Sequence, residues 1–240
     1  MIMITKISEI AIFADIPEID SPNIISKLKE RQFKKNHVLM FENDLSEDVY
    51  IIRSGMVKVY RIHEGKEIVL SISMPGDILG EVEALSNDSH RISSIEALEN
   101  VSVWQMTKQD FLQIVDRYPS VLRKAYMILV ERTRMLNRLI RYLTFYDVRT
   151  KAANLLVDLY YNFGEPDGDN FKIDLKINQS LLASMLGVTR ESISKTLGDF
   201  QNEGLIDIRE KYFYLLDKSQ LEAICSETEE VPALRKWYNV

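Results

Sequence analysis

Residues 179–198, QSLLASMLGVTRESISKTLG, have the pattern of two short helices joined by a tight turn. Ala183 is small where the second helix must pass closely over the first, and Gly187 stands where the chain needs a positive φ to turn sharply. The spacing of the apolar residues places them in one small core: Leu182, Leu186, Val188, Ile193 and Leu197. The segment therefore predicts a helix-turn-helix.

The second of these helices displays polar side chains on the face away from the core. Thr189 can cap its N-terminus, and the residues that follow carry hydrogen-bond donors and acceptors suited to base edges and phosphates in a major groove. An ordinary corner between two helices is the alternative, but the joint placement of turn, cap and polar face is more specific. We expect DNA contacts from Gln179, Thr189, Arg190, Glu191, Ser194 and Lys195.

Length and composition limit the class of protein. The chain has 240 residues, enough for two domains, with 46% hydrophobic and 28% charged residues, as in globular proteins. Its one cysteine, Cys225, cannot form an internal disulfide, and an iron–sulfur cluster takes about four thiolates. No apolar run approaches the roughly 20 residues of a membrane helix, and the first ten residues do not form a signal peptide. We expect a cytoplasmic protein with no membrane segment.

The net charge does not favour bulk attraction to DNA. It is −6, from 30 basic and 36 acidic residues, and the window 176–211 is balanced between the two signs. Binding must then depend on how Arg190, Lys195 and neighbouring basic groups face the phosphates, and on helix N-termini. We expect salt-sensitive specific binding and weak non-specific binding.

Residues 1–117 have the pattern of a β domain. Runs of β-branched and aromatic residues alternate with turn signals, which is typical of a sandwich or barrel-like roll. The sequence EGKE at 64–67 predicts a hairpin, and short helices are expected near 22–30 and 107–116. The expected strands are HVLMF (37–41), VYIIR (49–53), MVKVYRI (56–62), EIVLSISM (67–74) and VSVWQM (101–106).

Residues 118–146 form the longest helical pattern and link the two domains. One leucine row recurs every seven residues, with Ala125, Arg132 and Leu139 three positions further on, and a second apolar row runs beside it through Val121 and Ile128. We expect one row to pack on the roll and the other on a second copy of the chain, although a purely intramolecular core helix is the alternative. The expected dimer contacts are Leu122, Leu129, Leu136, Leu139 and Leu143.

Residues 147–240 read as a DNA-binding domain around the helix-turn-helix. A helix is expected at 148–163, a surface loop at 164–170 and a short strand at 171–175. A two-stranded wing is expected at 205–217, turning at 209–211, with a last helix beginning near Ser219.

Three motifs stand out in these segments: PGDILGE (75–81) followed by Arg91, LTFYDVRTKAANLL (143–156) and VTRESISKTL (188–197). On these motifs and the order of its segments, the chain resembles the cyclic AMP receptor protein/FNR (CRP/FNR) family of bacterial transcription regulators. The resemblance implies an α+β fold with an N-terminal cyclic-nucleotide-binding-like β-roll, a long dimerisation helix and a C-terminal winged helix-turn-helix. In the family, residues matching Arg190, Glu191 and Lys195 contact base edges or nearby phosphates. Lys195 replaces the commoner arginine, so a bidentate guanine contact becomes a single-point contact.

The resemblance also implies an effector site, with departures. In cyclic-nucleotide-binding relatives, Glu81 would accept the ribose 2′-hydroxyl and Arg91 would pair with the phosphate. Ile92 stands where those relatives have Ser or Thr, and Leu136 stands where a hydroxyl faces adenine, which disfavours cyclic AMP. Two interpretations stay open: a Glu81–Arg91 salt bridge that closes an empty roll, or a nucleotide-like effector. The effector would contact Gly80, Glu81, Arg91, Ile92 and Asn137.

Other chemistry is not favoured by the sequence. The redox-sensing branch of the family uses clustered cysteines, which this chain lacks. The three histidines, His37, His63 and His90, are expected in strands or loops and do not favour haem. No catalytic arrangement or metal-ligand spacing is visible, so we expect neither an enzyme nor a metal site.

The sequence thus predicts a homodimeric, sequence-specific DNA-binding transcription regulator that reads a two-fold symmetric site and is switched by a signal in the roll. If it activates transcription, the resemblance implies that surface loops such as 163–170 contact RNA polymerase. Two alternatives are a regulator of the same family that needs no ligand, and a cyclic-nucleotide-type sensor module with little DNA-binding role.

Overall fold

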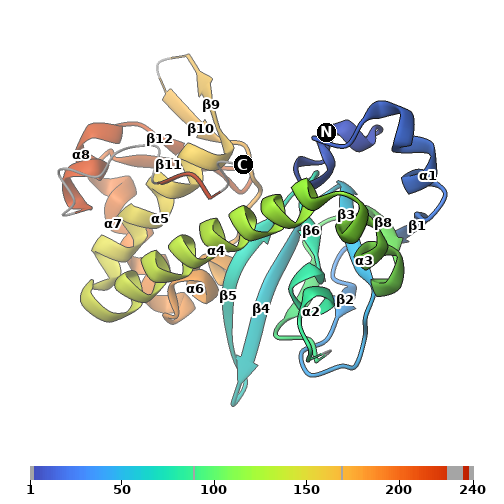
Figure 1. Ribbon diagram of the computed structural model, residues 1–240. Helices are drawn as coiled ribbons and strands as arrows, with labels where there is room; N and C mark the ends of the chain where they lie inside the picture. The colour runs from blue at the N-terminus through green and yellow to red at the C-terminus, as the bar shows by residue number, and fades with distance from the viewer. Residues whose placement is uncertain (1–2, 89, 169, 226–234, 238–240) are drawn as a thin grey trace. The chain divides into compact units, whose positions relative to one another are not determined.

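The computed structural model describes residues 3–88, 90–168, 170–225 and 235–237 (Figure 1). The described residues divide into two compact units. The first comprises residues 3–63, 69–88 and 90–130, and the second comprises residues 64–68, 131–168, 170–225 and 235–237. The long helix α4 (Pro119–Phe145) contributes residues to both units.

Two antiparallel four-stranded sheets form the β domain. One has the order β1-β8-β3-β6 and the other β2-β7-β4-β5. Their strands are β1 (Lys29–Phe33), β2 (Val38–Met40), β3 (Val49–Ser54), β4 (Val57–His63), β5 (Lys66–Ser73), β6 (Ile78–Leu79), β7 (Ser94–Ala97) and β8 (Val101–Met106). All five predicted strands of this domain are confirmed.

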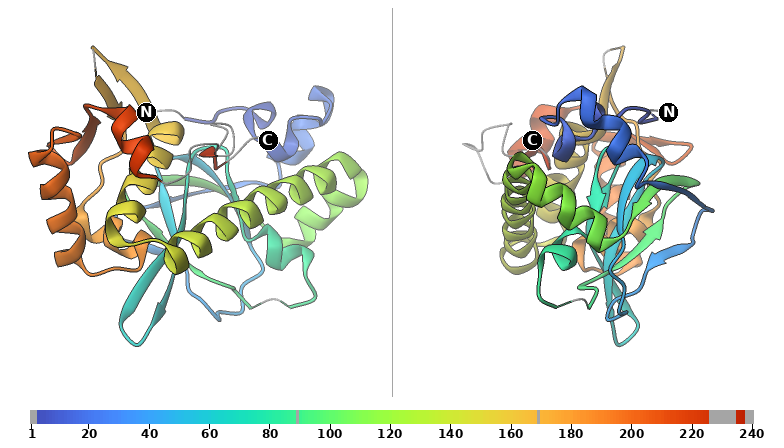
Figure 2. Two further views of the ribbon diagram at one scale, coloured as in Figure 1. Left: turned by 90° about the vertical axis from the view of Figure 1, so that its left-hand side faces the viewer. Right: turned by 45° about the vertical axis from the view of Figure 1, so that its right-hand side comes forward.

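Three strands escaped the sequence pattern, for physical reasons. β1 is an edge strand of mostly charged, exposed residues, so it has no apolar face to mark it. β6 has 2 residues and β7 has 4, too few for alternation to stand out. The predicted hairpin is present between β4 and β5 (Figure 2). Its turn has positive φ at Glu64 and Gly65.

Short helices cover one side of the β domain's core. The 3-10 helices η1 (Ile7–Glu9), η2 (Ala11–Phe13) and η3 (Glu18–Asp20) precede α1 (Ser21–Ile25), and α2 (Glu81–Leu85) and α3 (Lys108–Arg117) follow later in the chain. The first half of α4 packs on the same core through Val121, Ala125 and Ile128. The predicted second apolar row is therefore the one that α4 buries within the chain.

The second unit holds the helix-turn-helix and a sheet of order β11-β12-β10-β9. Its elements are α5 (Val148–Phe163), β9 (Gly164–Asp167), β10 (Asn170–Ile173), α6 (Gln179–Leu186), α7 (Arg190–Asn202), β11 (Ile206–Arg209), β12 (Tyr212–Leu215) and α8 (Lys218–Ile224). The predicted helices and the wing are confirmed. The predicted surface loop at 164–170 is wrong in part, because β9 pairs with β10 there. β9 is a fully exposed edge strand with Pro166, so nothing in its sequence alternates.

None of the helices in the described part of the chain combines the length and apolar character needed to span a membrane.

Candidate functional site

The helix-turn-helix has the local geometry that its sequence predicts. Gly187 ends α6 in the left-handed region, at φ 61°, where a side chain would be strained. Thr189 caps α7, because its Oγ1 accepts a hydrogen bond from the Ser192 N–H at 3.2 Å. The helices α6 and α7 pack against each other, and the predicted core residues Leu182, Leu186, Ile193 and Leu197 are each 1% exposed. Val188, also predicted in this core, is half-buried.

The candidate DNA-contacting residues gather on this motif. Thr189, Arg190, Glu191, Ser194 and Lys195 are all exposed, whereas Gln179 is half-buried at the first position of α6. In the described part of the chain, neither Arg190 nor Lys195 has a side-chain hydrogen bond or ion pair, so both side chains are available to a ligand.

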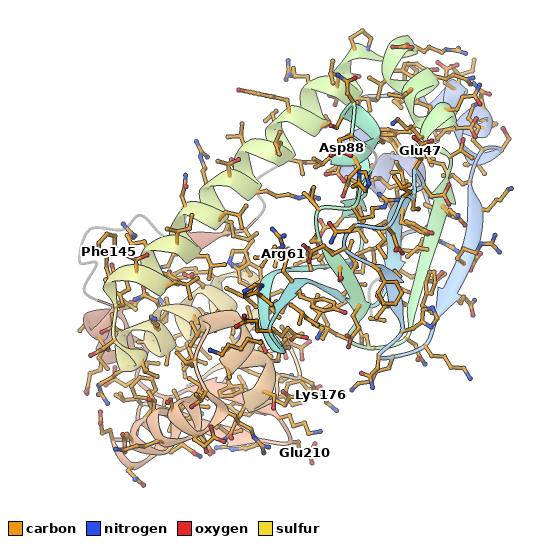
Figure 3. The ribbon with its side chains drawn as sticks, turned by 90° about the horizontal axis from the view of Figure 1, so that it is seen from below. Glu47, Arg61, Asp88, Phe145, Lys176 and Glu210 are labelled. Carbon is orange, nitrogen blue, oxygen red and sulfur yellow. The ribbon has the colours of Figure 1, made fainter. Side chains whose placement is uncertain are left out.

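The wing adds cations whose positions are fixed by aromatic rings. The Arg209 guanidinium lies 4.7 Å from the Tyr214 ring centroid and donates to Asp207 Oδ2 at 2.6 Å, which lowers the pKa of that carboxyl. Lys176 Nζ lies 5.2 Å from the Tyr212 ring centroid. Figure 3 labels Lys176 and, at the turn of the wing, Glu210. The sequence predicted the wing but not these stacked cations, since Arg209 and Tyr214 come from different strands and Lys176 comes from the segment before α6.

One ion pair holds the C-terminal end of α7 against α5. Both guanidinium nitrogens Nη1 and Nη2 of Arg149 donate to the Glu203 carboxylate, and the guanidinium lies 4.8 Å from the Phe200 ring centroid. These hydrogen bonds lower the pKa of Glu203. The residues are 54 positions apart, so sequence spacing carried no signal for the pair.

A buried carboxylate, Asp158, anchors α5 to α4 and to the end of the chain. Its Oδ1 accepts from Arg235 Nη1 at 2.7 Å and lies 3.3 Å from Arg138 Nη1, and its Oδ2 accepts from the Tyr142 hydroxyl at 2.8 Å. Burial raises the pKa of Asp158, and the two guanidinium groups oppose that shift. Asn162 extends the network by donating to the Arg235 carbonyl. The second half of α4 is thereby fixed to α5.

The exposed side of α4 carries an apolar stripe that Thr133 interrupts. The large apolar side chains of this stripe are Leu122, Tyr126, Leu129, Leu136 and Ile140, and Met127 and Phe145 are further exposed apolar residues of α4. The residues of the stripe follow the leucine row at steps of four and three residues, with the exposed Thr133 between Leu129 and Leu136. The exposed positions beside the leucines are thus those four residues after each leucine. The predicted positions three residues after a leucine face inward, because Ala125 is buried and Leu139 is half-buried. Leu143, the last leucine of the row, is half-buried as well.

The cassette, residues 80–88 and 90–92, contains a buried charged cluster formed by residues of α2 and by Arg91. Glu81, Glu83 and Arg91 are 3%, 7% and 1% exposed. Arg91 Nη2 donates to the Asp48 carbonyl and to Ser46 Oγ, and Arg91 Nη1 lies 3.7 Å from Glu83 Oε2. Arg91 therefore forms its ion pair with Glu83, a residue that the sequence analysis did not single out. Figure 3 labels Glu47 and Asp88, which lie on the loops flanking this cluster.

The residues present do not fit a cyclic nucleotide as they stand. The Arg91 side chain is 0% exposed, and the Ile92 N–H donates to Glu83 Oε1 at 3.1 Å. Ile92 itself is 59% exposed and offers no hydroxyl. Asn137 is an exposed residue on the second half of α4, which belongs to the other unit. A ligand anion would have to displace Glu83 to reach either donor.

We expect Gly80→Ala to destabilise the β domain by about 2 kcal/mol, more than Gly65→Ala. Both glycines have positive φ, but a Cβ at Gly80 would lie 2.4 Å from Arg91 Nη1 and 2.8 Å from the Asp48 carbonyl oxygen, whereas a Cβ at Gly65 meets nothing within 4 Å. Chemical denaturation of both variants measures the difference. Equal losses would show that Gly80 does not position Arg91.

In residues 3–88, 90–168, 170–225 and 235–237, no group of three or more His, Cys, Asp or Glu side chains could hold a metal ion. Cys225 is buried, and the three histidines are exposed, with His90 Nδ1 2.7 Å from Asp88 Oδ1.

Comparison with known proteins agrees with this arrangement. Residues 30–118 match the family model of the cyclic nucleotide-binding domain, and residues 150–224 match that of the Crp-like helix-turn-helix domain. A β domain of this type, a long helix and a DNA-binding helix-turn-helix define a two-domain transcription regulator. The chain belongs to the CRP/FNR family of these regulators.

Its similarity to named relatives extends over most of the chain. It is 27% identical over 199 residues to the CRP-like cAMP-activated global transcriptional regulator of Mycobacterium tuberculosis, covering 82% of this chain and 88% of the relative. It is 27% identical over 181 residues to the global nitrogen regulator of Nostoc sp., covering 75% of this chain and 81% of that protein. A solved structure of a CooA mutant from Carboxydothermus hydrogenoformans matches with a TM-score of 0.78 and 26% identity, covering 94% of this chain and 98% of that one.

Proposed function

We propose that this protein acts as a homodimer that binds a two-fold symmetric DNA site and regulates transcription from it, in the cytoplasm. The observation that carries the proposal is the exposed face of α7, where Arg190, Glu191, Ser194 and Lys195 stand on a helix that Thr189 caps. Side chains of these types read base edges in the major groove, where such a helix fits. The exposed cations of the wing, Arg209 and Lys211, add phosphate contacts on the same domain.

Dimerisation is supported by the apolar stripe on α4. Its alternating steps of four and three residues match a coiled-coil seam, with leucines at every other position. Fully burying a large apolar side chain contributes about 1.5–3 kcal/mol, so pairing two such stripes provides a substantial driving force. In a symmetric pair, each chain presents one α7 to one half of the DNA site.

We expect the Leu129→Glu/Leu136→Glu variant to weaken the dimer at least tenfold, because it places charges in the seam. Sedimentation velocity over a concentration series measures the effect. The matched control, Ile19→Glu/Ile25→Glu, adds the same charge at two exposed isoleucines outside α4 and should leave the dimer intact. A wild-type monomer, or equal dimer affinity in both variants, would contradict the seam.

A selection experiment tests the function directly. Wild-type protein, incubated with a pool of random DNA duplexes, should enrich an inverted repeat whose half-sites lie about 34–36 Å apart, one helical turn. Enrichment of a single asymmetric site, or of no sequence at all, would overturn the proposal.

The proposal also includes a signal in the β domain that controls DNA binding, and a surface for RNA polymerase. Because α4 contributes residues to both units, a signal that changes packing in the β domain can shift the population of DNA-binding conformations through this helix. If the protein activates transcription, residues 163–170 provide a surface for RNA polymerase, since residues 164–168 are exposed. A regulator of the same family without a ligand is the second candidate, and the Glu83–Arg91 pair favours it.

A further inference from the structure

A carboxylate of the chain itself occupies the donors that an anionic effector would need. Glu83 Oε1 accepts from the Ile92 N–H at 3.1 Å, and Glu83 Oε2 lies 3.7 Å from Arg91 Nη1. We propose that Glu83 is the internal anion of the cassette, and that its carboxylate excludes the phosphate of a cyclic nucleotide from Arg91. Ligand binding can be measured without DNA, so this inference and the proposed DNA binding can fail separately.

Backbone N–H groups and guanidinium groups are the usual partners of bound phosphates and carboxylates. At this site both kinds of donor face the same carboxylate, which is 9% exposed in its side chain. Because Glu83 lies in the short helix α2 and is fixed at both oxygens, it cannot leave the donors without losing both interactions. A phosphate would have to compete with a counter-ion that is already part of the fold.

The charge of the cluster also opposes a ligand anion. Two buried carboxylates, Glu81 and Glu83, stand in the first turn of α2, and Arg91 is the buried cation paired with Glu83. A phosphate would bring a further negative charge into a region of low dielectric constant, where like charges repel more strongly than in water.

Arg91 nevertheless keeps the capacity to bind an anion. No acceptor among the described residues forms a hydrogen bond with its Nε or Nη1, although both atoms are buried. A buried guanidinium that loses its counter-ion is strongly destabilised and gains from any anion that reaches it. Removing the Glu83 charge should therefore create an anion site where the wild-type protein has none.

Isothermal titration calorimetry of the full chain with cyclic AMP and cyclic GMP tests the inference. Wild-type protein should show no binding up to about 1 mM of either nucleotide. Glu83→Gln keeps the shape and an oxygen acceptor but removes the charge, and it should bind at least one of the two nucleotides at least tenfold more tightly than wild type. Glu83→Ala should gain at least as much, and Glu18→Gln, at an exposed glutamate elsewhere, should behave as wild type.

A double variant shows whether the gained affinity depends on Arg91. Glu83→Gln/Arg91→Gln should lose the binding that Glu83→Gln gains, and a thermal melt of each variant confirms that it is folded. Micromolar binding of either nucleotide by the wild-type protein would overturn the inference. So would a folded Glu83→Gln variant that gains no affinity, or a gain that persists without Arg91. Should Glu83→Ala fail to fold, Glu83→Gln decides the question.

Discussion

Replacing Arg190 and Lys195 together by alanine is expected to weaken sequence-specific DNA binding about 100-fold or more. A bidentate side-chain contact to a base, as expected of Arg190, contributes about 1–3 kcal/mol of discrimination, and the single-point contact expected of Lys195 adds to it. Both residues stand on the exposed face of α7. The fold should survive, because within the described part of the chain neither side chain has a hydrogen bond or an ion pair. The loss therefore reports on recognition rather than on stability.

Fluorescence anisotropy with a duplex selected by the wild-type protein measures this effect. The matched control is Lys34→Ala/Lys35→Ala, which removes the same two charges from exposed positions of the β domain after β1. That control should bind the selected duplex as the wild type does, at each salt concentration tested. Equal affinities of the α7 variant and the wild type for the selected duplex would show that Arg190 and Lys195 do not contribute to DNA binding.

The Asp158→Ala variant is expected to lower the free energy of unfolding of the DNA-binding unit by about 3–5 kcal/mol. Removing this carboxylate leaves the guanidinium of Arg235 and that of Arg138 without their shared counter-ion, and the Tyr142 hydroxyl without its acceptor. Arg235 is 4% exposed and Tyr142 is 3% exposed, so water cannot replace the lost interactions. The same variant should loosen the second half of α4 from α5.

Urea denaturation followed by circular dichroism measures the loss. Asp174→Ala is the matched control, since Asp174 forms an exposed ion pair with Lys172 whose removal should cost less than about 1 kcal/mol. Asp158→Asn should fall between the two, because its amide oxygen can still accept one hydrogen bond. Similar losses in Asp158→Ala and Asp174→Ala would show that the buried network contributes little to stability.

The sequence predicted the helix-turn-helix because its determinants are local. The apolar spacing, the turn at Gly187 and the cap at Thr189 all act within 20 residues, and each is present in the structure. The strand pattern and the extent of α5 were predictable for the same reason. The edge strands β1 and β9 were not, since exposed strands have no buried face for the sequence to encode.

The leucine row on α4 shows where periodicity stops being informative. The heptad spacing predicted one apolar row that contacts a second copy of the chain and one that packs on the β domain. A helix of 27 residues with two adjacent apolar rows can present more than one combination of residues to a second copy. Val121 and Ala125 pack on the core of the β domain. The exposed residues that accompany the leucines are therefore Tyr126 and Ile140, and not the predicted Ala125 and Leu139.

The sequence by itself determined the class of protein: a β domain, a long helix and a helix-turn-helix, each specified by short-range patterns of apolar and polar residues. Only the tertiary structure decided which charges meet. Arg91 pairs with Glu83, and Asp158 joins Arg138 to Arg235 across 97 residues of chain, because burial brings these groups together from distant segments or turns them inward. Ion pairs of this kind have no fixed sequence spacing, since the fold rather than the local chain sets the distance between the partners.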